Sequence, residues 1–68
     1  MKIKYFSDTD TALIELRGGI IFETMEINED CSVDLNKDGK VISITIEHAK
    51  EGALIKEFSF HEIDHATA

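Results

Sequence analysis

Residues 33–47 constrain the fold more than any other part of the chain, because they have the pattern of two strands joined by a tight turn. Asp38 and Gly39 are residue types that accept the positive φ of a hairpin turn. After the turn, isoleucine alternates with polar residues from Ile42 to Ile46, which is typical of a strand with one buried face. The sequence therefore predicts a small antiparallel β domain.

Alternation and turn residues predict five strands joined by short polar links. The predicted strands cover residues 2–6, 12–16, 20–27, 32–36 and 41–47. Short links between sequential strands are typical of a meander, in which each strand pairs with the next. The predicted fold class is α+β, mostly β. We expect one domain, residues 1–68, with a five-stranded antiparallel meander over 1–47 and a C-terminal tail over 48–68.

The tail departs from the strand pattern. Ser59, followed three residues later by Glu62, has the spelling of a capping box and predicts a short helix from Phe60 onward. Gly52 opposes a helix, because glycine lowers helical stability by about 1 kcal/mol relative to alanine. A single open sheet needs a cover on its apolar face. We expect a short C-terminal helical segment, or a second copy of the chain, to cover that face.

The chain has 68 residues, which allows one domain with a thin core, since chains of this size bury only about 60% of their unfolded surface. Cys31 is the single cysteine and has no intrachain disulfide partner. We therefore expect a homodimer or another partner to add buried surface. A lone thiol fits a reducing compartment, and the longest apolar run is three residues. A cytoplasmic protein without a signal peptide or membrane span is the expectation.

Acidic residues dominate the composition. Fourteen Asp and Glu against seven Lys and Arg give a formal net charge of −7. Phosphate backbones repel such a chain, so we do not expect direct binding to nucleic acid. An acidic surface suits a basic protein partner, or it serves solubility alone.

Residues 61–65 spell H-E-x-x-H. On a helix, His61 and His65 would share one face and could bind zinc, with Glu62 as a general base. The context is not that of a protease, because three residues follow His65 and the chain is too short for a substrate cleft as well. We expect no catalytic residues, no metal and no other cofactor. A small metal-binding protein that uses His61 and His65 is kept as an alternative.

Residues 34–39 match the first half of a calcium loop, with the spelling D-x-N-x-D-G. The twelfth position of such a loop needs glutamate and is Thr45 here, so a hairpin turn is the expected role. Cys31 has acidic sequence neighbours and no second cysteine, which disfavours a reactive thiolate. No phosphate-binding loop or serine-nucleophile pattern occurs, and no enzyme activity is expected.

Three apolar residues fall on the face opposite to their strand's main apolar set: Leu13, Phe22 and Val41. Such residues are either scattered or gathered into an interface patch. We expect a partner-binding surface that combines them with acidic residues of the same region. Those acidic residues are Glu23, Glu26, Glu29 and Asp30.

Several short motifs are spread over about residues 1–50. They are Tyr5, Asp10-x-Ala12-Leu13-Ile14-x-Leu16, Val33-Asp34, Asp38-Gly39, Ile46-Glu47 and Ala49. In this order they resemble the short bacterial proteins of the family known as domain of unknown function 2283. Thr45 replaces the glycine that usually precedes the Ile-Glu pair, and the tail histidines are not a family hallmark. The resemblance implies no established enzyme activity. It also implies an antitoxin role for some members, which are encoded beside small toxin-like proteins.

The expected function is therefore a non-enzymatic protein-interaction module, with antitoxin-like neutralisation of a small basic protein as its most specific form. An acidic domain can mask a basic partner by charge complementarity and by an added strand. The alternatives are the metal-binding protein described above and an acidic mimic of nucleic acid that inhibits a nucleic-acid enzyme.

Overall fold

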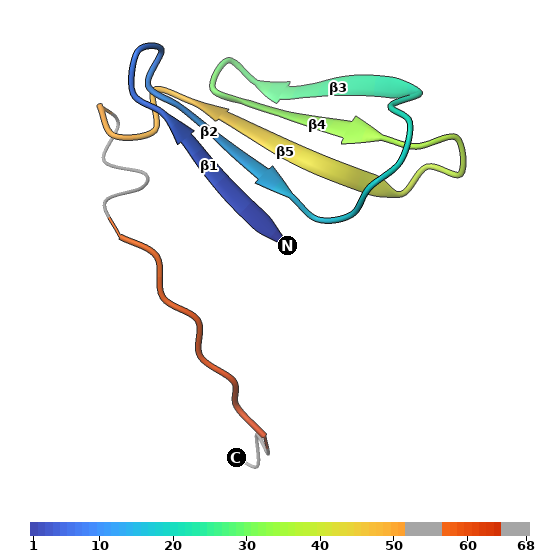
Figure 1. Cartoon of the computed structure of the whole chain (residues 1–68). Helices are drawn as coiled ribbons and strands as arrows, with labels where there is room; N and C mark the ends of the chain where they lie inside the picture. Colours follow the sequence, from blue (N-terminus) through green and yellow to red (C-terminus); the bar gives the residue numbers. More distant parts are fainter. Residues whose placement is uncertain (52–56, 65–68) are drawn as a thin grey trace.

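The computed structural model describes residues 1–51 and 57–64, in which the chain forms one five-stranded antiparallel sheet (Figure 1). Of the predicted α+β class, the mostly β part is confirmed, all predicted strands are present, and the described residues contain no helix. The third begins at Glu23 instead of the expected Ile20. The strands are β1 (Lys2–Phe6), β2 (Thr11–Glu15), β3 (Glu23–Asn28), β4 (Cys31–Leu35) and β5 (Val41–Glu47).

The strands are ordered β1-β2-β5-β4-β3, so the predicted simple meander is wrong for the link between β2 and β3. β1 and β2 form a hairpin, whereas β3, β4 and β5 form a three-stranded meander whose last strand inserts beside β2. Residues 16–22 connect the middle of the sheet to its far edge. β5 is the longest and most isoleucine-rich strand, and the central position gives it a pairing partner on both sides.

One face of the sheet is apolar from edge to edge. Because side chains alternate along a strand, residues that are aligned by the register share a face. Here they form two adjacent rows, which we call the apolar face: Ile3, Ile14, Ile44, Val33 and Met25 in the first row, and Tyr5, Ala12, Ile46 and Cys31 in the second.

The opposite face, here called the polar face, includes Lys4, Leu13, Glu15, Thr24, Glu26, Ser32, Asp34, Ser43 and Thr45. Side-chain hydrogen bonds connect three of its strands. Asp34 accepts one from Ser43 Oγ at 2.6 Å and another from Thr24 Oγ1 at 2.7 Å. Lys4 Nζ lies 3.5 Å from Glu15 Oε1. The polar face therefore satisfies its own polar groups and is suited to contact with water.

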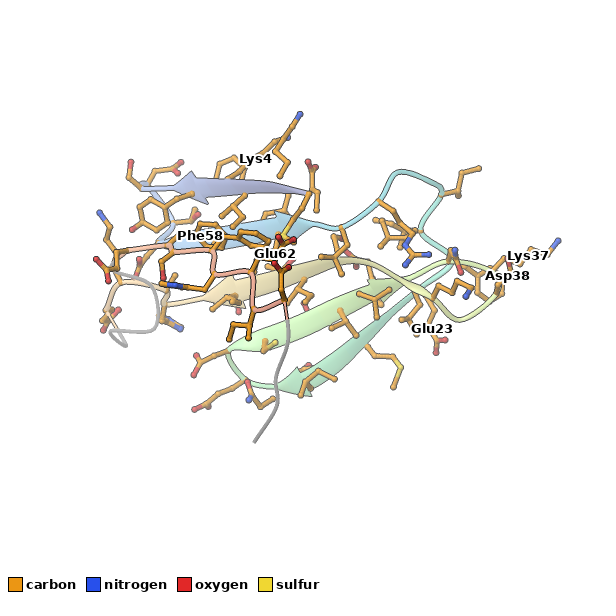
Figure 2. All side chains as sticks on the ribbon, turned by 90° about the horizontal axis from the view of Figure 1, so that it is seen from below. Lys4, Glu23, Lys37, Asp38, Phe58 and Glu62 are labelled. Carbon is orange, nitrogen blue, oxygen red and sulfur yellow. The ribbon has the colours of Figure 1, made fainter. Side chains whose placement is uncertain are left out.

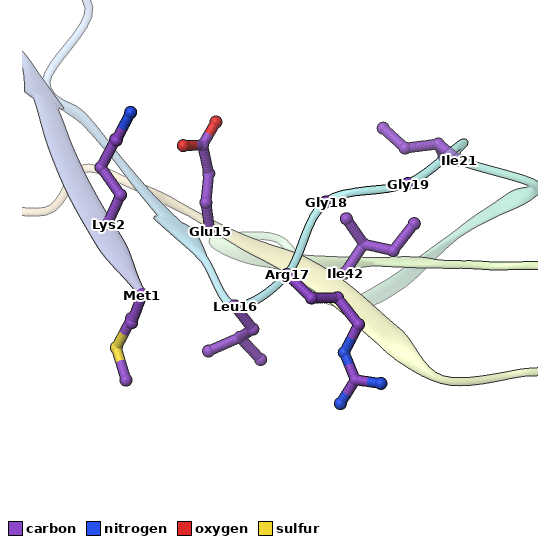
Figure 3. A pocket seen from close by; sticks show the side chains of 9 residues that line it. All are labelled: Met1, Lys2, Glu15, Leu16, Arg17, Gly18, Gly19, Ile21 and Ile42. Atoms are coloured by element: carbon purple, nitrogen blue, oxygen red, sulfur yellow. The ribbon is translucent and has the colours of Figure 1, made fainter.

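A β-bulge moves Ile42 away from the apolar face. The register shift lies between Asp34 and Leu35 of β4, opposite Ile42. Figure 3 shows the Ile42 side chain directed toward the connection after β2, on the side that carries Lys2. A Cβ built on Gly19 would lie 3.7 Å from Ile42 Cδ1, so the connection covers this side chain. The predicted placement of Ile42 on the same face as the other β5 isoleucines is wrong for this reason.

Little of the described chain is buried. The buried apolar residues are Ala12, Ile42 and Ala49, and no large side chain among the described residues is fully buried. Ile44 is only half-buried although it lies in the central strand. One sheet layer thus leaves its apolar face largely open.

Residues 57–64 leave the sheet as an extended segment without regular secondary structure (Figures 1 and 2). The predicted helix from Phe60 is therefore not formed over this part, and the rest of that prediction falls on residues 52–56 and 65–68, outside the described residues. Alternation from Phe58 to His61 favours extended backbone, and aromatic residues are weak helix formers. Phe58 and Phe60 border a hollow with Met1 and Ile3, which places the segment on the side of the apolar face. The described residues include no helix with the length and apolarity to cross a membrane.

Candidate interaction surface

β3 is an edge strand that is exposed along its whole length. It pairs with β4 on one side, and no strand of residues 1–51 and 57–64 pairs with the backbone N–H and C=O groups on its other side. Regular pairing runs from Glu23 to Glu26, and a bulge follows between Glu26 and Asn28. The part of this edge that can accept another strand is therefore Glu23–Glu26.

Carboxylates lie along this edge strand and in the turn that follows it. No Lys or Arg occurs from Ile20 to Asn36, and Lys37 follows two residues after Leu35, the register partner of Glu23. The four acidic residues that the sequence predicted for partner binding gather here: Glu23 and Glu26 in β3, and Glu29 and Asp30 in the turn before β4. Since Glu23 and Glu26 are three residues apart in a regular strand, their side chains lie on opposite faces.

The opposite edge strand carries both signs of charge. β1 contains Lys2 and Lys4, and Figure 2 shows Lys4 and Glu23 at opposite edges of the sheet. Lys4 is paired with Glu15, and Asp8 and Asp10 follow in the turn after β1. A basic partner is therefore attracted more strongly by β3 than by β1.

The three predicted apolar contributors do not form one patch. Phe22 directly precedes β3, and its N–H donates a hydrogen bond to the Leu35 carbonyl at 2.8 Å. Val41 also pairs with Leu35, but it lies in the central strand β5, and β4 separates it from the β3 edge. Its register with Leu35 puts Val41 on the side of the apolar face, not on the opposite face as predicted. Leu13 pairs with Thr45, four residues from Val41 along β5 and thus about 13 Å away, on the polar face. Only Phe22, which is 70% exposed, lies at the acidic edge.

The β1–β2 turn contains a cluster that the sequence interpretation missed. Asp10 Oδ1 accepts hydrogen bonds from the Tyr5 hydroxyl at 2.6 Å and from the Lys50 N–H at 2.9 Å. Its Oδ2 accepts the Glu51 N–H at 3.1 Å, and its carbonyl accepts the Ala49 N–H at 3.0 Å. The Lys50 ammonium lies 4.8 Å from the centre of the Tyr5 ring. Asp10 therefore connects β1 to the turn that follows β5.

Both acidic groups of this cluster have altered pKa values. The hydrogen bond from Tyr5, followed by those from the Lys50 and Glu51 amides, lowers the pKa of Asp10. The same hydrogen bond to Asp10 raises the pKa of the Tyr5 hydroxyl. Asp10 also has a positive φ of 54°, which aspartate accepts more readily than most residues. Two signals were present in the sequence: this preference, and the presence of Tyr5, Asp10 and Ala49 among the family-like motifs. Neither indicates the contact itself, because the partners in the turn lie some forty residues away.

A second pair joins the end of β5 to the β3–β4 turn. His48 Nδ1 lies 3.0 Å from Asp30 Oδ1, and the Asp30 carbonyl accepts the Glu47 N–H at 2.7 Å. The hydrogen bond to Asp30 raises the pKa of His48. Asp30 thus has a structural partner as well as a place on the acidic edge.

The two sequence motifs that resemble metal sites, at residues 34–39 and 61–65, lie in different parts of the structure. Asn36 Oδ1 accepts the N–H groups of Asp38 and Lys40, each at 2.9 Å, and the predicted hairpin turn is confirmed. His61 is exposed, and His65 lies outside the described residues. Among residues 1–51 and 57–64, no three His, Cys, Asp or Glu side chains are grouped as metal ligands. Cys31 is free and half-buried on the apolar face.

Comparison with known proteins identifies a family and no function. No curated protein and no solved structure matches the chain. A family model described as protein of unknown function, DUF2283, matches residues 2–50. This range runs from the first residue of β1 to the turn after β5, whereas the segment 57–64 lies outside it. Because the match covers most of the 68 residues, the chain belongs to the DUF2283 family.

Proposed function

We propose that this chain is a non-enzymatic protein-interaction module that binds a small basic protein at the β3 edge, as an antitoxin-like neutraliser would. One observation carries the proposal: β3 is an exposed edge strand in the described residues, and it carries carboxylates within a stretch, Ile20 to Asn36, that contains no Lys or Arg. A strand added to an exposed edge gains main-chain hydrogen bonds, and its side chains supply selectivity.

The charges at β3 select against an identical strand and in favour of a basic one. If the β3 edges of two copies paired, the carboxylates of Glu23 and Glu26 from both copies would gather along one contact, which is unfavourable. Lys or Arg on a foreign strand would face Glu23–Glu26 with opposite charge. Such complementarity accelerates association and excludes acidic competitors.

The partner contact would begin at Glu23 and stop before the bulge. Phe22, directly before β3, adds an exposed aromatic ring at one end of that edge. Exposed aromatic residues beside a polar rim are typical anchors of protein interfaces. The expected footprint is therefore Phe22–Glu26 together with Glu29 and Asp30.

The test compares three versions of the tagged full chain in pull-downs from the lysate of its own host. The edge variant is Glu23→Lys with Glu26→Lys. The matched control is Glu57→Lys with Glu62→Lys, which makes the same change in net charge on the extended segment (Glu62 is labelled in Figure 2). We expect the native chain and the control to retain one small basic protein at low salt and to release it at high salt. The edge variant should not retain it.

Equal retention by all three versions would show that the acidic edge does not recognise the partner. Retention of the bait alone would count against an interaction with a basic protein in that host. Circular dichroism of each variant establishes that the sheet is intact. Among the described residues, neither metal binding nor mimicry of nucleic acid has a comparable observation in its favour.

A further inference from the structure

The apolar face is largely open in the described residues, and binding of a partner at the β3 edge would not cover it. The row from Ile3 to Met25 crosses all five strands without a polar side chain. Ile3 and Met25, at its two ends, are 37% and 46% exposed. Ile44, at its centre, is still only half-buried. A continuous apolar surface of this kind marks an interface.

The exposed area is large for a chain of this size. A compact protein of 7.6 kDa exposes about 4,300 Å², whereas this chain exposes 5596 Å². This excess is shared between the apolar face and the rest of the chain, including the extended segment with Phe58 and Phe60. An interface of standard size, which buries roughly 800 Å² per partner, would remove a large part of it.

Charge identifies the surface through which two copies could approach each other. Each copy has a formal net charge of −7, so contact through a charged surface is opposed by repulsion. Neither row of the apolar face contains a charged residue. Charged groups approach the face at its margins. Asp10 and Lys50 contact Tyr5 at the end of the second row. Glu23 lies one row beyond Met25 on the edge strand. Charged residues lie on the polar face instead, as in a sheet whose outer side meets water.

The chain's own extended segment is too narrow to cover this face. Phe58 and Phe60 lie beside Met1 and Ile3, at the β1 edge. Five strands span about 20 Å, while one extended segment covers the width of about two strands. Phe58, Phe60 and Ile63 are 65%, 76% and 77% exposed, so they require a cover themselves. A second sheet has the matching width and can contact these side chains as well.

We propose that two copies of the chain pack their apolar faces together as a β-sandwich dimer. The two sheets would lie about 10 Å apart, with both polar faces outward. The row Ile3–Met25 forms the centre of the contact, and Phe58 and Phe60 extend it at the β1 edge. The β3 edge of each copy stays free, so this inference does not depend on the proposed function, and either can fail without the other.

The first test uses the unmodified full chain. We expect sedimentation equilibrium to give the mass of a dimer and the melting temperature to rise with protein concentration. Isotope-filtered NOE spectra of a mixture of ¹³C-methyl-labelled and unlabelled chains should show contacts between copies from the methyl groups of Ile3, Ile14 and Ile44. These readouts need no substitution, so a variant that fails to fold cannot obscure them.

Substitutions then locate the interface. Ile44→Asp should abolish the dimer, whereas Thr45→Asp, the next residue on the opposite face of β5, should not. Met25→Ser, at the exposed end of the row, is a milder change. It should raise the dimer dissociation constant about tenfold or more, because each copy loses one buried apolar side chain.

Three results would overturn the proposal. One is a monomer whose melting temperature does not change with concentration. Another is a dimer whose contacts between copies come from β3 or from the polar face. The third is a set of contacts within one chain from Phe58 and Phe60 to Ile44, which would show that the chain's own extended segment covers the face.

Discussion

The Tyr5 hydroxyl donates a hydrogen bond to Asp10 Oδ1 at 2.6 Å, and the same carboxylate also accepts the amides of Lys50 and Glu51. The β1–β2 hairpin is therefore attached to the point where the chain leaves β5. The contact between Tyr5 and Asp10 therefore contributes to the stability of the sheet.

Removal of the Asp10 carboxylate should lower the melting temperature more than removal of the Tyr5 hydroxyl. Asp10→Ala eliminates three side-chain hydrogen bonds and places alanine at a φ of 54°, whereas Tyr5→Phe eliminates one. Asp10→Asn keeps an acceptor oxygen and tolerates the positive φ, so it should lower the melting temperature less than Asp10→Ala does. Thermal melts of the three variants at one protein concentration test this order. A larger effect for Tyr5→Phe than for Asp10→Ala would contradict it.

The stability of the chain should fall in acid because of Asp10. Its pKa in the folded state lies below the ordinary value of 3.8, mainly because Tyr5 donates to the carboxylate. A lowered folded-state pKa means that the contribution of Asp10 to stability is fully present above pH 3.8 and is lost as the pH falls through the folded-state pKa. Melting temperatures between pH 2 and 6 measure this loss. The melting curve of Asp10→Asn should depend less on pH over that interval.

The strands could be predicted from the sequence, but their order could not. Alternation and turn residues are local, and they correctly indicate five strands and the turn at Asn36–Gly39. The insertion of β5 beside β2 depends on pairing between residues far apart in the chain, to which a local pattern is insensitive. The same limit explains why the predicted face of Ile42 was wrong. The β-bulge that redirects this side chain depends on the pairing of β5 with β4, which a local pattern does not reveal.

The candidate surface was also partly predictable. The acidic residues of β3 and of the following turn are close in sequence, and they remain close in the fold. Leu13 and Val41 were predicted to share a surface only because each alternates out of phase with the other apolar residues of its strand. The observed pairing separates them. The contact between His48 and Asp30 joins residues 18 positions apart. No spacing rule for turns or strands connects residues at that separation.

His48 should titrate above its ordinary pKa, and Asp30 should be the cause. The hydrogen bond to Asp30 raises the pKa of His48 from the ordinary value of 6.5. The stability that it contributes is fully present below pH 6.5 and is lost as the pH rises through the folded-state pKa. An NMR titration of the imidazole should show a lower pKa in Asp30→Asn. Because both side chains are exposed, 1 M salt should reduce the difference. An unchanged titration in Asp30→Asn would rule out this pair as the cause.

Asp34 and Ser43 should be coupled energetically. Ser43 is only 5% exposed, and its hydroxyl donates to Asp34 Oδ2. Asp34→Ala leaves that hydroxyl without its acceptor, at a cost of about 1–3 kcal/mol, while Ser43→Ala costs about 1 kcal/mol. The double variant should therefore lose less than the sum of the two single losses. Urea unfolding of the four proteins measures the coupling, and strict additivity would contradict it.

Gly39 should be required for its backbone conformation and not for space. Its φ is +81°, and a Cβ at this position would meet nothing within 4 Å. Gly39→Ala should therefore destabilise the chain by about 1–2 kcal/mol through the left-handed conformation alone.

Gly18→Ala is the matched control, because Gly18 also has open space around its Cβ position but has no positive φ. It should be neutral or slightly stabilising, since alanine restricts the unfolded chain. Gly39→Asn should retain most of the stability, because asparagine enters the left-handed region more readily than alanine. Urea unfolding of the three variants at equal concentration decides the matter: equal losses for Gly39→Ala and Gly18→Ala would show that the hairpin does not depend on the conformation of Gly39.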